Sequence, residues 1–119
     1  MKLTFILFAL TFVFNFAVNA QTNNDVKKPL KFDINKTIVN IEKISNQNLE
    51  VMLKASIIEK TDDNFYMVKD KSGKMKVSLS NDQISNIGNY SETDIFFITV
   101  KVKDFKKQTF TALKINKAE

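Results

Sequence analysis

Residues 49–80 read LEVMLKASIIEKTDDNFYMVKDKSGKMKVSLS, and this stretch decides the fold because its apolar residues recur at every second position. A period of two is typical of strands with one buried face. A polar turn and a loop containing Gly73 divide the stretch, as expected between hairpin strands. It therefore predicts a meander of three strands, at residues 49–60, 64–70 and 74–79.

The flanking sequence predicts two short helices and two more strands. Ser80 and Gln83 have the spacing of a capping box, in which each side chain satisfies a backbone amide, and Gly88 can end the helix. The β-prone residues that follow predict strands at residues 94–103 and 109–115. Before the meander, isoleucines at helical spacing predict an amphipathic helix over residues 37–45.

This order of elements is that of an OB-fold, an all-β, five-stranded Greek-key barrel with a helix between its third and fourth strands. The long first strand of such a barrel bends to join both sheets, and Ala55 is a small residue placed mid-strand where a bend is expected. An SH3-like barrel is the main competing fold, but it normally lacks the capped helix. We therefore predict an OB-fold domain over residues 37–119.

The first twenty residues have the pattern of a cleavable secretory signal peptide. Lys2 supplies a positive charge, an apolar run follows, and Val18-Asn19-Ala20 suits cleavage after Ala20. A membrane anchor is the alternative, since the run approaches the length needed to span a bilayer. We expect cleavage, because asparagines interrupt the end of the run. Residues 21–36, which contain the only Pro, are interpreted as a flexible leader.

Composition excludes several kinds of chemistry. The chain has no His, Cys, Arg or Trp, which removes cysteine and Ser-His catalysis as well as nitrogen and sulfur metal sites. The adjacent carboxylates Asp62 and Asp63 fall in a predicted turn, where solvation is the usual role. We therefore predict a non-enzymatic protein with neither cofactor nor metal. Its net charge of +5 is modest and spread along the sequence.

OB-folds bind ligands on the outward face of strands one to three and on the loops beside it. Here that face carries Met52, Ser56 and Ile58 among lysines, a mixture that can stack on sugars, bases or peptide side chains and attract anions. The competing interpretation is that the leader around Phe32 and Ile34 covers the face. The candidate ligand-binding residues are Lys54, Phe65, Met67, Lys69, Lys74, Lys76, Phe105, Lys106 and Lys107.

Residues 49–80 also resemble the bacterial OB-fold (BOF) family of periplasmic stress-tolerance proteins, the YgiW/YdeI-like proteins. Ala55 stands where that family usually has Gly. The resemblance implies a soluble periplasmic protein of a Gram-negative bacterium, associated with oxidative, metal or envelope stress and without a known catalytic centre. It is carried by Val51, Leu53, Ile57, Tyr66, Asp70, Gly73, Val77 and Leu79.

Three hypotheses for the function follow. The first is a periplasmic binding module that recognises an envelope component, whether glycan, peptide or protein. The second is binding of single-stranded nucleic acid outside the cytoplasm, which the modest charge and the lack of Arg make the weaker idea. The third is a structural role as the docking partner of another envelope protein. In each case we expect a monomer without a membrane span after signal cleavage.

Overall fold

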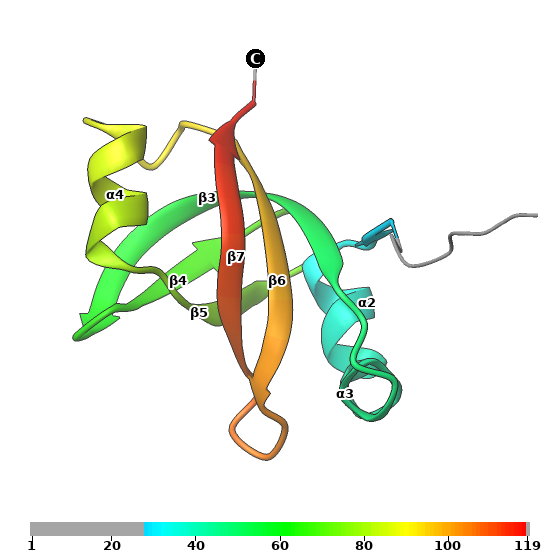
Figure 1. Cartoon of the computed structure of the whole chain (residues 1–119). Coiled ribbons are helices and arrows are strands. Elements are labelled where there is room, and N and C mark those ends of the chain that lie inside the picture. The colour runs from blue at the N-terminus through cyan, green and yellow to red at the C-terminus, as the bar shows by residue number, and fades with distance from the viewer. Residues whose placement is uncertain (1–27, 119) are drawn as a thin grey trace, which may run out of the picture.

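The computed structural model describes residues 28–118, and the predicted signal peptide lies outside the described residues. These residues form a closed five-stranded barrel with short helices (Figure 1). Neighbours follow the order β3-β4-β5-β7-β6, and β3 pairs again with β6 to close the barrel. Only the β5–β7 pairing within the barrel is parallel. The predicted fold class is confirmed, with strands β3 (Val51–Asp62), β4 (Phe65–Lys69), β5 (Lys74–Ser78), β6 (Phe96–Asp104) and β7 (Thr109–Lys117).

Strand β3 belongs to both halves of the barrel, and it changes partner where the bend is predicted. Residues Val51 to Ala55 pair with β6, whereas Ser56 and the following residues pair with β4. The Ala55 side chain is buried, so the small residue lies on the inside of the barrel at the point of change. Figure 1 shows the resulting long curve of β3 over the barrel.

The N-terminal region is more ordered than the sequence predicts. Two short helices, α2 (Ile34–Val39) and α3 (Ile41–Asn46), replace the single predicted helix and meet at Asn40. The predicted leader is corrected as well, since its last residues form β2 (Leu30–Lys31) and the start of α2. Strand β2 pairs in parallel with the start of β3. The early start of α2 has a local cause, because the Asp33 carboxylate accepts a hydrogen bond from the Lys36 amide and caps the helix.

Helix α4 (Asn81–Ile87) confirms the predicted capping box. The Ser80 hydroxyl accepts from the Gln83 amide at 3.1 Å, and the Ser80 amide donates to the Gln83 side chain at 2.8 Å. Gly88 ends the helix with a φ of 70°, a conformation that costs glycine little. Figure 1 shows α4 on the opposite side of the barrel from α2 and α3. None of the helices within residues 28–118 has the length and apolarity to cross a bilayer.

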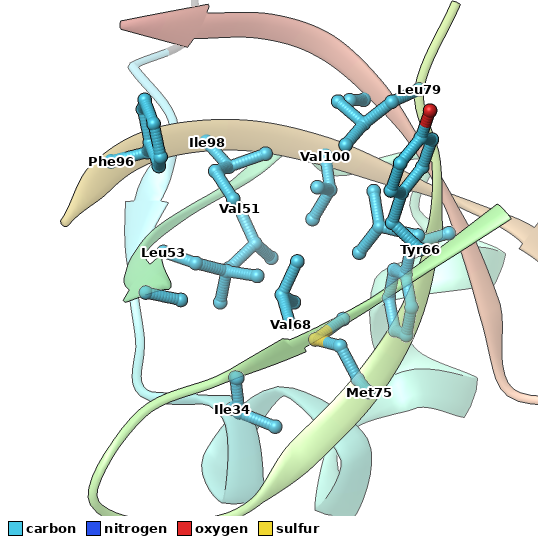
Figure 2. Packing of buried hydrophobic residues seen from close by; sticks show 14 of the residues in the cluster. Ile34, Val51, Leu53, Tyr66, Val68, Met75, Leu79, Phe96, Ile98 and Val100 are labelled. Carbon is cyan, nitrogen blue, oxygen red and sulfur yellow. The ribbon is translucent and has the colours of Figure 1, made fainter. Parts of the chain in front are cut away.

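The barrel interior is filled by alternate residues of all five strands, as the period of two predicts. Figure 2 shows the side chains of β3, β4, β5 and β6 meeting in the interior, with Ile34 of α2 reaching in from one side. The buried apolar residues are Ile34, Ile41, Ile44, Val51, Leu53, Ala55, Ile57, Tyr66, Val68, Met75, Val77, Leu79, Phe96, Ile98, Val100, Phe110 and Ala112. Because burial of one large apolar side chain contributes about 1.5–3 kcal/mol, this cluster is the main source of stability.

Candidate ligand-binding surfaces

The structure divides the predicted binding face into two surfaces. Phe65 and Lys76 lie in a cluster with Lys103 of β6, which we name the Phe65 cluster. Lys54 and Lys69 lie elsewhere, in an open groove along β3. Three further residues of the predicted face line this groove: Met52, Ser56 and Ile58.

In the Phe65 cluster, two ammonium groups approach one aromatic ring. The Nζ atom of Lys103 lies 4.5 Å from the centroid of the half-buried Phe65 ring, and that of Lys76 lies 5.8 Å away. Lys76 also pairs with Asp62 at 3.8 Å. Lys103 was not among the predicted residues, because it comes from β6, which reaches the cluster only through its pairing with β7 and that of β7 with β5. The cluster is a cationic, partly aromatic surface suited to anionic ligands.

The remaining predicted residues are spread around these two surfaces. Met67 is half-buried opposite Lys76, and Lys69 lies opposite Lys74, so two like charges face each other across β4 and β5. Within the described residues, no cation–π or aromatic contact joins the β6–β7 loop to Phe65. That loop holds the exposed residues Phe105, Lys106 and Lys107.

The groove follows the outward face of β3 from Glu50 to Ile58, a length of about 26 Å at the usual rise per residue. One wall is formed by residues 29–33 and 69–72, and the other by residues 92–95 with the outward side chains of β6 and β7. Its volume of about 1730 Å³ exceeds the range of about 300–1,000 Å³ of small-molecule pockets. The shape therefore suits an elongated ligand.

Part of the predicted leader borders this groove and does not cover Phe65. Phe32 lines the groove, and its ring lies 4.7 Å from the Lys36 ammonium. Ile34 is fully buried in the barrel interior. The described residues of the leader therefore leave the Phe65 cluster open.

The wall formed by β6, β7 and the preceding loop contains three exposed apolar side chains among polar ones, and the sequence prediction missed these three. Ile95, Phe97 and Leu113 are 36%, 39% and 45% exposed, and all three line the groove. A signal was present, since Ile95-Phe96-Phe97-Ile98 is an unbroken apolar run in a strand expected to have one polar face. We name these three residues the apolar wall.

The opposite wall contains the β4–β5 hairpin, which Asp70 holds in place. Its carboxylate accepts from the Ile34 amide at 2.9 Å, the Ser72 amide at 2.7 Å and the Gly73 amide at 3.1 Å. The Ser72 hydroxyl adds a fourth hydrogen bond at 2.6 Å. Partial burial alone would raise the pKa of Asp70, but these donors outweigh it and lower the pKa. The carboxylate therefore joins α2 to the hairpin as a charged acceptor.

The described residues offer no arrangement typical of catalysis. They contain no group of three or more His, Cys, Asp or Glu that could hold a metal ion. The other shifted group is Tyr90, whose pKa is raised by burial and by the neighbouring Tyr66. Tyr90 packs edge-on against Phe96 at a centroid distance of 6.1 Å, so its role is in packing.

The fold and its surfaces place the protein in the class of OB-fold-like barrels, and solved structures agree. No family model and no curated protein sequence matches this chain. The hypothetical protein ygiW from E. coli is similar in structure, with a TM-score of 0.58 and 19% identity over 78% of this chain and 100% of that chain. The expected resemblance to YgiW-like proteins is therefore confirmed at the level of the fold.

Two further solved structures, both from S. pombe, are similar as well. The telomere capping protein Ten1 from S. pombe matches with a TM-score of 0.56 and 12% identity, over 76% of this chain and 82% of that chain. A chain of the S. pombe Stn1-ten1 complex matches with a TM-score of 0.57 and 12% identity, over 77% of this chain and 78% of that chain. At these identities the matches establish the barrel alone.

Proposed function

We propose that this chain is an exported, non-enzymatic binding protein of the bacterial periplasm that contributes to tolerance of envelope, oxidative or metal stress. The groove along β3 is its binding site in this proposal. One observation carries the assignment: Ile95, Phe97 and Leu113 are large apolar side chains that converge, exposed, on one concave surface of a closed barrel. Exposed apolar surface of this kind marks contact sites in proteins.

The periplasmic location and the stress role have separate support. The signal-peptide pattern of residues 1–20 favours export, and the family resemblance of residues 49–80 favours a stress-tolerance role. The structural likeness to ygiW spans the whole of that chain, so the same barrel is present in both proteins.

The test is complementation of a deletion strain in the source bacterium. The wild-type gene should restore survival under oxidative, metal or detergent stress, and the double variant Phe97→Ser, Leu113→Ser should not. The matched control is Phe105→Ser, which removes an equally exposed apolar side chain, 41% accessible, outside the groove. Full rescue by the groove variant, or recovery of the protein in the cytoplasm with its first twenty residues intact, would contradict the proposal.

A second candidate function is binding of single-stranded nucleic acid at the Phe65 cluster. The specific observation in its favour is the pair of ammonium groups on the Phe65 ring, since aromatic rings stack on bases and lysines neutralise phosphates. Oligonucleotide binding should then fall steeply with salt concentration, and Lys103→Gln should reduce the salt slope. Absence of oligonucleotide binding at low salt would remove this candidate.

A further inference from the structure

The two walls of the groove differ in chemistry. Phe97 lies opposite Lys54 in the β3–β6 register, so the apolar wall borders β3 on that side. Lys69 lies opposite Ser56 in the β3–β4 register, and Lys71 follows in the hairpin on the same side. A ligand lying along β3 therefore meets most of the exposed apolar side chains on one edge, together with Glu92 and Lys114, and three of the lysines, together with Phe32, on the other.

The charges of the groove favour an anionic ligand. Among the described residues, the ion pairs are Lys76–Asp62 and Lys117–Asp94, and neither involves a lysine of the groove. Four carboxylates line the groove, and backbone amides fix the positions of two of them, Asp33 and Asp70, through hydrogen bonds. Five lysines line the same groove, so five positive charges face four negative ones and leave a small excess of +1: Lys31, Lys54, Lys69, Lys71 and Lys114.

The floor of the groove favours a hydrocarbon chain over a peptide or a glycan. Strand β3 is paired with β2, β4 and β6, so its outward face presents side chains to the ligand. Met52 and Ile58 offer no hydrogen-bond partner to the amides of an extended peptide or to the hydroxyls of a sugar, so these two residues contribute apolar contact alone. Peptides that bind sheets usually pair with a free strand edge. An acyl chain has no polar groups to satisfy.

We propose that the groove binds a single lipid molecule with an anionic headgroup. The acyl chain lies along the apolar wall, and the headgroup is held by Lys54, Lys69 and Lys71 at the hairpin. Lysines of this kind cover apolar surface with their methylene stems while the ammonium group contacts the anion. The inference rests on the proposed function, because it assigns a ligand class to the same groove.

The experiment is a titration of the isotope-labelled protein, purified from cells expressing the full gene, with lysophosphatidylglycerol below its micelle concentration. Amide resonances of the groove floor and of the apolar wall should shift, and those of the Phe65 cluster should not. Lysophosphatidylcholine, which has the same chain and a zwitterionic headgroup, should bind more weakly. Glycerol 3-phosphate, which has the headgroup charge and no chain, should cause no saturable shift.

Variants then separate the contributions of chain and headgroup. Phe97→Ser and Leu113→Ser should each weaken lysophosphatidylglycerol binding about tenfold, the effect of losing roughly 1.4 kcal/mol. Lys54→Gln with Lys69→Gln should bring the affinity for the anionic lipid down to that for lysophosphatidylcholine. Val39→Ser and Lys43→Gln, at exposed positions outside the groove, are the matched controls and should bind like the wild type. Because both apolar residues are substantially exposed, the spectra of the variants should retain the dispersion of a folded barrel.

Several results would overturn the inference. The first three are absence of lipid binding, equal affinity for both lipids, and shifts confined to the Phe65 cluster. The fourth is a dimer that buries the apolar wall and does not respond to lipid, because a second copy of the chain would then occupy the groove.

Failure of the proposed function would give different results. If lipid binding fails while the groove variant still loses stress tolerance in cells, the groove is functional and only the ligand class is wrong. If lipid binds but the groove variant rescues the deletion strain fully, the inference stands and the proposed function is wrong.

Discussion

Phe96 and Phe97 are neighbours in β6, yet one is fully buried in the barrel interior and the other is 39% exposed in the groove. The interior and the groove are built from the same strands, using alternate residues. The interior side chains are completely buried, and their burial stabilises the folded barrel. The apolar groove side chains are only partly buried and leave apolar surface exposed to water, as is common at contact sites.

The sharpest test of this contrast is a pair of substitutions at these two positions. Phe96→Ala should destabilise the protein by about 3–5 kcal/mol, because it removes a buried ring and leaves a cavity. Phe97→Ala should cost less, about 1–2 kcal/mol, because its ring is 39% exposed and so only partly buried. Urea unfolding measures both. If both substitutions lowered the free energy of unfolding equally, Phe97 would belong to the core, and the interior and the groove would not differ in their contribution to stability.

A second pair tests the same contrast within β3. Ala55→Leu should cost about 1–3 kcal/mol, because Ala55 is buried where the strand changes partner and a larger side chain overpacks the interior. Its neighbour Lys54 is exposed, so Lys54→Leu should be tolerated. Thermal unfolding of the two variants checks the prediction. A tolerated leucine at position 55 would mean that the bend does not depend on a small residue.

Asp70 links the two regions, because it joins the hairpin of the groove wall to the buried start of α2. Asp70→Ala should cost about 1–2 kcal/mol at neutral pH, since hydrogen bonds to a charged group are lost at a partly exposed site. The pKa of Asp70 is lowered in the folded state, so its contribution is present at neutral pH and is lost as the pH falls through that lowered value. Urea unfolding of both proteins should show their difference shrinking in acid. If the difference in the free energy of unfolding between the two proteins did not depend on pH, Asp70 would not stabilise the fold through its charged form.

The smallest effect is expected at the cap of α4, which lies outside both regions. Ser80→Ala should cost about 1 kcal/mol by removing one half of the capping box. Ser85→Ala, at an exposed position within the same helix, is the control and should have almost no effect. Thermal unfolding distinguishes the two. A loss of lipid or oligonucleotide binding in the Ser80 variant would show that α4 contributes to a surface we assign elsewhere.

Much of the fold was predictable because local patterns determine it. The alternation in residues 49–80, the capping box at Ser80 and the small residue at Ala55 each act within a few positions. The N-terminal elements were less predictable. Strand β2 exists only because β3 lies beside it, and the break at Asn40 leaves no strong pattern in the sequence.

The candidate site was predicted only in part, and the reason is tertiary. The sequence predicted Lys54 and Lys69 as candidate residues because they lie on strands that are adjacent in sequence. Lys103 and Leu113 join the surfaces through the pairings of β6 and β7, which depend on closure of the barrel. Phe97 could have been found by asking why a strand expected to be half exposed is apolar on both faces.

Closure of the barrel also has a consequence for how the chain acquires its structure. Strand β3 pairs Val51 with Val100, and β5 pairs in parallel with β7, so the defining contacts join distant parts of the chain. Such topologies fold slowly, because long loops must close before the contacts that stabilise them form. A polypeptide still lacking β6 and β7 cannot complete the barrel. The contacts that close the barrel therefore form only after β6 and β7 have been synthesised.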